Sequence, residues 1–395
     1  MRETPNNRNR TSTTQALLAI FAAYFLLGIG IAQAQQEAPV IENGARGSMR
    51  NGPSLVEKAV VGLDGPEESL LFRPVNILFD AEGDIYVADS GQHAILIFSR
   101  DGKYKSRIGR EGDGPGEFRM PVVSYFSWEG ELVVEDPGNG RRSFFSMSGE
   151  FLRSESLGPI FMGGSPIPTV AGEYVRPGQG AVIMRMTMGD GSEDEPEEPG
   201  LIEVIDNEGN VKLKIGTRKE HEDRMIGIIV NRVSMDYSPP NHVVVCFQNA
   251  NEIHVYNKST GALERIITRR LSFNPKEPNM EMKTERTTDA NGGVSIMARL
   301  LPDVDPIADD MAVDLEGRIW VLTHLMTSEK SGEKEADGEF EGLMRLEVFS
   351  MEGELLSTIP LDIAASMIAF DPSGDLWLID TRGSLSGIRY EVVWP

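Results

Sequence analysis

Three aspartates stand at the ends of short apolar runs and could together bind a metal ion. They are Asp89, Asp136 and Asp380, and a tight glycine-containing segment follows each of them. Calcium takes about six to eight oxygen ligands, which carboxylates commonly supply. Each carboxylate could instead accept hydrogen bonds from the backbone of the loop that follows it. We expect this structural role, and calcium binding is the alternative.

A second group of polar residues could bind an organic ligand. Arg73 and Arg119 occur in two related segments, Phe-Arg-Pro and Phe-Arg-Met-Pro, and Asn231-Arg232 precedes another apolar run. A guanidinium group can hold a carboxylate through two parallel hydrogen bonds. The alternative is that these arginines pair with nearby acidic residues, including Asp309 and Asp310. The ligand-binding candidates are Arg73, Arg119, Asn231, Arg232, Asp309 and His324.

The residues do not form an evident catalytic set. Cys246 is the only cysteine, and its apolar neighbours predict a buried structural thiol, so no intrachain disulfide can form. The glycine-rich segment 109–116 lacks the Lys-Ser or Lys-Thr that follows a phosphate-binding loop. We therefore expect no catalytic residue and no cofactor, with calcium as the candidate ion if one binds.

The charge of the chain limits its partners. Its 61 acidic and 38 basic residues give a formal net charge of -23. Such a surface repels the phosphate groups of nucleic acids and anionic lipids. Nucleic acid is therefore not an expected partner.

The N-terminus has the pattern of a secretory signal peptide. Arg2, Arg8 and Arg10 precede an apolar run at 16–32, and Ala32-Gln33-Ala34 follows the pattern of a cleavage site. We expect a signal peptide over 1–34, a periplasmic or secreted protein, and no stable membrane insertion after cleavage. The alternative is an uncleaved membrane anchor, because the run approaches the length of a membrane-spanning helix. Residues 35–53 are expected to form a disordered linker.

A repeated unit of four short strands must position the candidate residues. In the first unit, apolar runs at 75–79, 85–89, 94–98 and 104–108 are separated by turns rich in Gly and Asp. Similar turns define six units, and packing such sheets around an axis buries their faces. The sequence therefore predicts an all-β, six-bladed β-propeller with four antiparallel strands per blade. The blades are expected at about 75–108, 122–157, 173–215, 230–268, 310–359 and 367–392.

The sixth unit lacks its fourth strand, because the chain ends just after the third. The apolar segment 55–61 lies before the first complete unit and could supply the missing strand. A sixth blade built from both ends of the chain would close the ring and protect its edges. The propeller is therefore expected to occupy residues 54–395.

The segment 84–121 carries a family resemblance. Its Asp-Ile-Tyr-Val-Ala-Asp start, His93, the Ser-Arg-Asp-Gly turn at 99–102 and the Gly-Pro-Gly-Glu-Phe connection at 114–118 resemble an NHL repeat. Gln92 and Ala94 depart from the pattern, which usually has Asn and Arg there. The other blades resemble it in outline only. The resemblance implies the propeller fold, which serves binding scaffolds, signalling ectodomains and some enzymes.

Three insertions lengthen the later blades, at 189–200, 271–305 and 327–342. In an antiparallel meander, loops between second and third strands and connections between blades emerge at the same end of the ring. We therefore expect all three as loops at one end, where they either form a binding face or decorate the surface.

These observations lead to three functional hypotheses. The preferred one is an exported, non-catalytic module that binds a protein, peptide or glycan. Resemblance to lactonase-like and lyase-like propellers implies a metal-dependent enzyme as the alternative, with ligands among Asp89, Asp136, Asp380 and His324. A membrane-tethered sensor or assembly protein is the third, and it requires an uncleaved signal.

Overall fold

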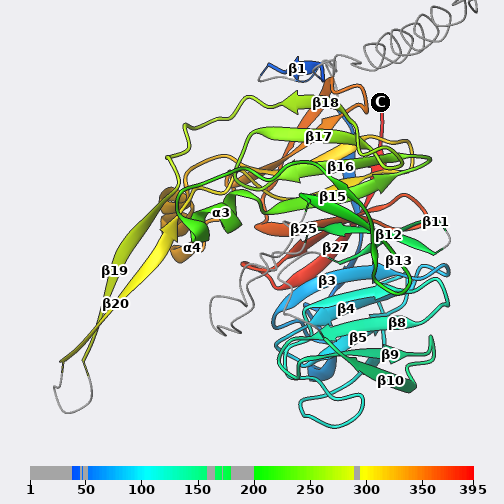
Figure 1. The fold of residues 1–395 in the computed structure, drawn as a ribbon. Coiled ribbons are helices and arrows are strands. Elements are labelled where there is room, and N and C mark those ends of the chain that lie inside the picture. The colour runs from blue at the N-terminus through cyan, green and yellow to red at the C-terminus, as the bar shows by residue number, and fades with distance from the viewer. Residues whose placement is uncertain are drawn as a thin grey trace, which may run out of the picture. The chain divides into compact units, whose positions relative to one another are not determined.

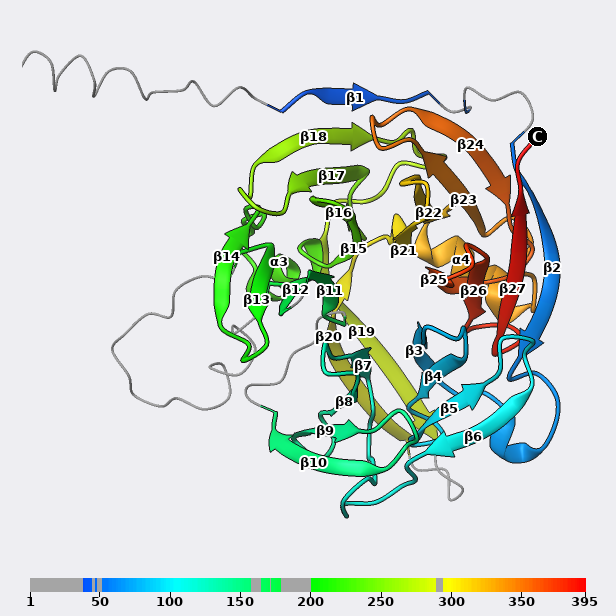
Figure 2. The same cartoon turned by 90° about the vertical axis from the view of Figure 1, so that its right-hand side faces the viewer.

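A computed structural model describes residues 38–44, 47, 52–157, 165–170, 172–178, 200–288 and 294–395. The expected signal peptide lies outside the described residues. The chain divides into residues 1–39 and 40–395, and all described strands belong to the second unit. Six antiparallel sheets are arranged in a ring, as Figure 2 shows, and this confirms the predicted six-bladed β-propeller.

In blades one to five, four consecutive strands run in chain order from the inner to the outer edge. Blade one contains β3 (Pro74–Phe79), β4 (Ile85–Asp89), β5 (Ala94–Phe98) and β6 (Tyr104–Ile108), and blade two contains β7 (Val123–Phe126), β8 (Leu132–Asp136), β9 (Arg141–Phe145) and β10 (Phe151–Ser156). Blade three contains β11 (Ile167–Val170), β12 (Glu173–Pro177), β13 (Ile202–Asp206) and β14 (Val211–Ile215). Blade four contains β15 (Val233–Ser238), β16 (His242–Phe247), β17 (Glu252–Asn257) and β18 (Leu263–Thr268), and blade five contains β21 (Ala308–Val313), β22 (Ile319–His324), β23 (Met344–Phe349) and β24 (Leu355–Pro360).

Blade six is built from both ends of the chain, as expected. Its first three strands are β25 (Ala365–Phe370), β26 (Leu376–Asp380) and β27 (Ser386–Val393). The outer strand is β2 (Ser54–Val61), which pairs antiparallel with β27. A short 3-10 helix, η1 (Glu67–Ser69), then leads from β2 toward blade one.

Part of the expected linker is ordered. β1 (Val40–Glu42) pairs in parallel with β18 and adds a fifth strand to blade four. The Asn43 side chain extends this contact to blade five, because its Nδ2 donates to the Gly353 carbonyl at 2.9 Å and its Oδ1 accepts the Leu355 amide at 2.8 Å. The prediction of a disordered linker was therefore wrong for residues 40–42, since the exposed edge of blade four offers them a backbone partner.

Aspartates give the first turns of blades one, five and six the same local structure. Asp80, Asp314 and Asp371 each accept the amides of the residues two and four positions later. The residue six positions later donates to the same carboxylate, through the Tyr86 hydroxyl at 3.3 Å, the Trp320 indole at 2.9 Å and the Trp377 indole at 3.3 Å. One carboxylate thus satisfies both the turn and a buried aromatic side chain.

Apolar clusters hold neighbouring blades together. Five buried clusters span five junctions: blades one and two, three and four, four and five, five and six, and six and one. Cys246 is 1% exposed within the cluster between blades four and five, as its apolar neighbours predicted. Among the described residues, no such cluster spans blades two and three. That junction is held by Tyr125, Trp128 and Tyr174, with Tyr125 and Tyr174 ring centroids 5.8 Å apart and the Trp128 amide donating to Tyr174 Oη at 2.9 Å.

Blade three begins earlier than the sequence predicted. Its inner strand is β11, so residues 173–177, expected as the inner strand, form the second strand instead. The first turn lies at Gly172, where φ is +78°, and not at the glycine-rich segment after Pro177. The insertion between the second and third strands is therefore longer than 189–200, and its residues 179–199 lie outside the described residues.

The other two insertions contain regular structure where we expected loops. Residues 271–305 contain a two-stranded hairpin of β19 (Asn279–Thr288) and β20 (Val294–Asp303), and residues 327–342 contain α4 (Ser328–Ala336). A further helix, α3 (Arg224–Val230), lies in the connection between blades three and four. In Figure 1, α4 and the hairpin lie on the same side of the blades, so two of the three insertions share one end of the ring, called here the loop-bearing end; residues 189–199 of the third lie outside the described residues. α3, which was not predicted, lies on the same side.

Candidate functional site

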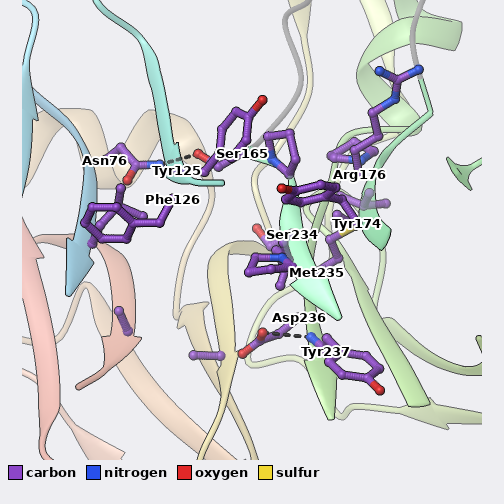
Figure 3. A pocket seen from close by; sticks show the side chains of 18 of the residues that line it. Asn76, Tyr125, Phe126, Ser165, Tyr174, Arg176, Ser234, Met235, Asp236 and Tyr237 are labelled. Atoms are coloured by element: carbon purple, nitrogen blue, oxygen red, sulfur yellow. Dashed lines mark hydrogen bonds between the residues drawn. The ribbon is translucent and has the colours of Figure 1, made fainter. Parts of the chain in front are cut away.

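A cavity of about 1380 Å³ lies along the axis of the ring and is lined by residues of all six inner strands. It also reaches between blades two and three, where Glu135, Arg142 and Arg176 line it. Figure 3 shows part of this cavity. The lateral extension coincides with the one junction that lacks an apolar cluster among the described residues.

Two carboxylates face this cavity from the inner strands of blades four and five. Asp236 accepts the Tyr237 amide at 2.7 Å through Oδ1 and the Val313 amide of β21 at 2.8 Å through Oδ2. Asp310 accepts the Met311 amide at 2.9 Å and the Ile368 amide of β25 at 3.0 Å. β15, β21 and β25 are the inner edge strands of their sheets, so amides on their free edge can donate to such side chains. The two side chains therefore connect the inner strands of three consecutive blades.

Burial makes both carboxyl groups weak acids. It raises the pKa of Asp236 from 3.8 to about 6, and the backbone hydrogen bonds oppose this shift. Burial raises the pKa of Asp310 from 3.8 to about 7, and the neighbouring charge of Asp236 adds to the effect. Both side chains are only half-buried on the cavity side. Near neutral pH the pair can therefore both donate and accept hydrogen bonds toward a molecule in the cavity.

Further polar groups line the cavity near these carboxylates. Gln248 Nε2 donates to the Asp309 carbonyl at 2.9 Å and to Ser234 Oγ at 3.4 Å. Asn76 on β3 donates to Ser165 Oγ, as the dashed line in Figure 3 marks. The Asn76 Oδ1 atom is buried and has no hydrogen-bond partner among the described residues. The cavity thus offers carboxyl, amide and hydroxyl groups together with the aromatic side chains of Tyr125, Phe126 and Tyr237.

Two of the predicted ligand-binding residues meet at the loop-bearing end of the cavity. His324 Nε2 lies 2.8 Å from Asp309 Oδ1, and Arg382 donates to Asp309 Oδ2 at 2.8 Å. Arg382 also pairs with Glu335 of α4 at 3.3 Å. His324 is 2% exposed, so its imidazole supports this network from within the protein. The Asp309 side chain lines the cavity.

The other predicted ligand-binding residues are dispersed. Arg119 pairs with Asp113 at the surface, as in the alternative we considered. Arg73 is exposed, and the preceding Phe72 is 51% exposed, whereas Phe118 is fully buried between blades. Arg232 is exposed where the cavity opens.

Asn231 has a structural role at the end of α3. Its Oδ1 accepts the Lys219 amide at 2.7 Å, and its Nδ2 donates to the carbonyls of Lys219 at 2.8 Å and Gly227 at 2.7 Å. The side chain is 7% exposed. Its polar atoms are therefore already used in holding α3 on blade four.

The three aspartates proposed as metal ligands are not brought into one site. Asp89 accepts the amides of Phe72, Arg73, Gly91 and Gln92 at 2.7 to 3.0 Å. Asp136 and Asp380 accept amides in the same manner, from residues 119 and 120 and from residues 382 to 384. The described residues contain no group of three or more His, Cys, Asp or Glu side chains that could hold a metal ion. Each aspartate accepts backbone hydrogen bonds, which is the geometry of the structural role.

Sequence reasoning missed Asp236, Gln248 and Arg382, and it considered Asp310 only as a partner for arginine. A signal was available for the two carboxylates, because each interrupts an otherwise mainly apolar inner strand. Their approach to the next blade depends on how the blades pack around the axis, which the sequence does not display.

Comparisons with known proteins concern the fold. The DUF5128 family model, described as a 6-bladed beta-propeller, matches residues 42–125, about a fifth of the chain. No curated protein sequence matches significantly. The described residues include no helix long and apolar enough to cross a membrane.

Several solved structures are similar. A protein from Bacteroides fragilis described as exported has 10% identity, a TM-score of 0.53 and coverage of 89% of this chain and 99% of its own. A gluconolactonase from Xanthomonas campestris has 14% identity and a TM-score of 0.47, and the match covers 88% of this chain and 97% of that protein. A streptogramin B lyase has 12% identity and a TM-score of 0.43, and the match covers 86% of this chain and 98% of that protein. At such identities the likeness to the Bacteroides protein concerns the fold alone. Together with the family match and the strand order, it shows that this chain folds as a six-bladed β-propeller.

Proposed function

We propose that this protein is an exported, NHL-type propeller that binds a peptide or glycan segment in its axial cavity. The observation that carries the proposal is the pair Asp236 and Asp310, two half-buried carboxyl groups that face a cavity of about 1380 Å³. Ligand sites are typically concave, with a few converging polar groups on a rigid scaffold. Here the scaffold is the ring itself, because the same carboxylates join blades four, five and six.

The lining defines the chemistry of the ligand. Carboxyl groups with raised pKa values can accept hydrogen bonds from hydroxyl or ammonium groups and can donate when protonated. The aromatic rings of Tyr125, Phe126 and Tyr237 offer apolar surface for a sugar ring or a side chain. The acidic character of the chain disfavours anionic ligands. We therefore propose a neutral or cationic ligand rich in hydrogen-bond donors.

The ligand would enter at the end of the ring that carries α3, α4 and the β19–β20 hairpin. Asp309, His324 and Arg382 form a hydrogen-bonded network there. Long connections gathered on one end of a rigid scaffold are where binding residues commonly occur.

The geometry gives the metal-dependent enzyme less support. Asp89, Asp136 and Asp380 already accept between two and four hydrogen bonds from backbone amides, so a cation at these oxygens would compete with them. We therefore prefer a binding function over a metal-dependent hydrolase or lyase activity.

A peptide and glycan array tests the proposal. The mature protein, the double variant Asp236→Asn/Asp310→Asn and the surface control Glu352→Gln would be compared on the same array, after thermal melts establish that each is folded. We expect binding of a defined ligand class by the wild type and the control, and at least about tenfold weaker binding by the double variant. Equal binding by all three proteins would contradict a role for the axial cavity.

A second measurement tests export. Mass spectrometry of the protein from its native host should find a mature N-terminus at or close to Gln35. A chain that retains residues 1–34 would instead favour the membrane-tethered alternative.

A further inference from the structure

The β19–β20 hairpin is an arm that projects from the loop-bearing end of the ring (Figure 1). Its two strands form a separate two-stranded sheet, and neither edge pairs with another described strand. Isolated two-stranded hairpins are marginally stable in water, and unpaired edges are templates for further strand pairing. The arm therefore has an unsatisfied edge on each side.

The base of the arm is fixed. Asp305, 2% exposed, accepts the Lys276 amide at 3.1 Å, the Ser328 amide at 2.8 Å and the Ser328 hydroxyl at 2.9 Å. These bonds tie the hairpin to the start of α4. The arm consequently leaves the ring in a defined direction, although the body of its first strand is exposed.

Apolar side chains lie exposed on the arm, and the most exposed are Met282 and Leu300 on one face; Leu301, 39% exposed, lies opposite Glu281 on the other. Met282 pairs with Leu300 across the two strands, and they are 61% and 56% exposed. The neighbouring residues Glu281, Lys283 and Thr284 are exposed as well. Successive residues of a strand point to opposite faces, so Glu281 and Lys283 share the face opposite to Met282.

The free edge of β19 is complementary to itself. If two copies of β19 pair antiparallel about a two-fold axis at Met282, each Glu281 lies opposite Lys283 of the other copy. On the other face Met282 meets its own counterpart, and the two Leu300 side chains extend this apolar strip. A closed two-fold interface requires a surface that is self-complementary in this way. Opposite charges and apolar pairs directly across an antiparallel ladder are stabilising.

The edge of β20 is less suited to such pairing. Pro302 has no N–H to donate to a partner strand. Asp303, the only acidic residue of β20, already forms an ion pair with Lys276. On β19, Glu281 and Lys283 are both exposed and contact each other only at 4.0 Å, so they remain able to pair across an interface, and charge complementarity favours the β19 edge.

We propose that β19 is a homodimerisation strand, which joins two copies of this chain into a continuous four-stranded sheet in the order β20, β19, β19 and β20, centred on Met282. The contact is small and lies in the class of weak, concentration-dependent interfaces. It leaves the axial cavity of each copy as a separate site, so it does not depend on the proposed function.

Charge exchange tests the pairing. Glu281→Lys and Lys283→Glu each place two like-charged pairs across the axis, whereas the double variant restores two opposite-charged pairs with the signs reversed. Sedimentation velocity over a concentration series should show a dimerisation constant weakened by about tenfold in each single variant and restored in the double variant. A wild-type protein that stays monomeric throughout, or a double variant no better than the single ones, would overturn the proposal.

Cross-linking tests the register. Cys246 is the only native cysteine and is buried, so an introduced cysteine reports alone. Met282→Cys should form an intermolecular disulfide under mild oxidation, because residue 282 faces its counterpart within disulfide reach. Thr284→Cys is the matched control on the same face, and its counterpart would lie about 14 Å away. Equal or faster cross-linking of the Thr284→Cys variant would refute a pairing centred on Met282.

Discussion

Replacing Asp310 by asparagine should remove a pH dependence of stability that the wild-type protein shows. Asp310 accepts two backbone amides, from Met311 and Ile368, and faces Asp236 and Ser234 of β15 in the cavity. An asparagine side chain keeps one of the two acceptor oxygens, and it does not ionise. The lost hydrogen bond costs about 1 kcal/mol at every pH, so the pH dependence isolates the ionisation.

The magnitude follows from the pKa shift. Burial raises the pKa of Asp310 from 3.8 in the unfolded chain to about 7 in the folded protein. Between these values the folded state binds a proton that the unfolded state has released, so the free energy of unfolding falls as pH rises. The difference corresponds to about 4 kcal/mol as an upper value, because the side chain keeps some contact with the cavity. The penalty is absent below pH 4 and complete above pH 7.

Urea denaturation of both proteins at pH 4, 5.5, 7 and 8 checks this prediction. The wild type should lose up to about 4 kcal/mol more than the Asp310→Asn variant between pH 4 and pH 8. Comparing the two proteins cancels the repulsion among the many surface carboxylates, which both share. Parallel pH profiles for the two proteins would refute the reasoning that Asp310 carries a raised pKa.

Three further outcomes are expected from the contacts that hold the ring together. Asp89→Ala leaves four backbone amides without their acceptor and should lower the free energy of unfolding by about 3 kcal/mol in urea denaturation, whereas a change below about 0.5 kcal/mol would contradict its structural role. Deleting residues 54–61 exposes the edge of β27, so size-exclusion chromatography should find aggregated or unfolded protein, and a monomer with wild-type melting would contradict closure by β2. Asn43→Ala removes the bonds from β1 to Gly353 and Leu355 and should cost about 1 kcal/mol, measured in the same denaturation assay, while unchanged stability would show that β1 contributes nothing to blade five.

The repeated turns explain why the fold was predictable. Asp80, Asp314 and Asp371 recur with the same spacing to a glycine and an aromatic residue, so local sequence encodes the first turn of blades one, five and six. The inner strand of blade three was predicted wrongly because its first turn, at Gly172, is short, whereas the glycines after Pro177 have the composition of a turn. β1 was missed because a three-residue strand depends on the edge that receives it, not on its own sequence.

The candidate site was predictable only in part. Asp309 and His324 were both among the ligand-binding candidates, and they are hydrogen-bonded to each other. The approach of Asp236 to Val313 and of Asp310 to Ile368 joins residues of different blades. Such contacts are set by the packing of blades around the axis, which leaves no local pattern in the sequence.

Hydrogen–deuterium exchange of the mature protein, with and without the tightest ligand from the array, tests the axial site most directly. We expect protection concentrated in the inner strands β15, β21 and β25, whose amides donate to Asp236 and Asp310. Outer strands should exchange as they do without ligand. Protection confined to the outer strands or to the β19–β20 hairpin would contradict binding in the axial cavity.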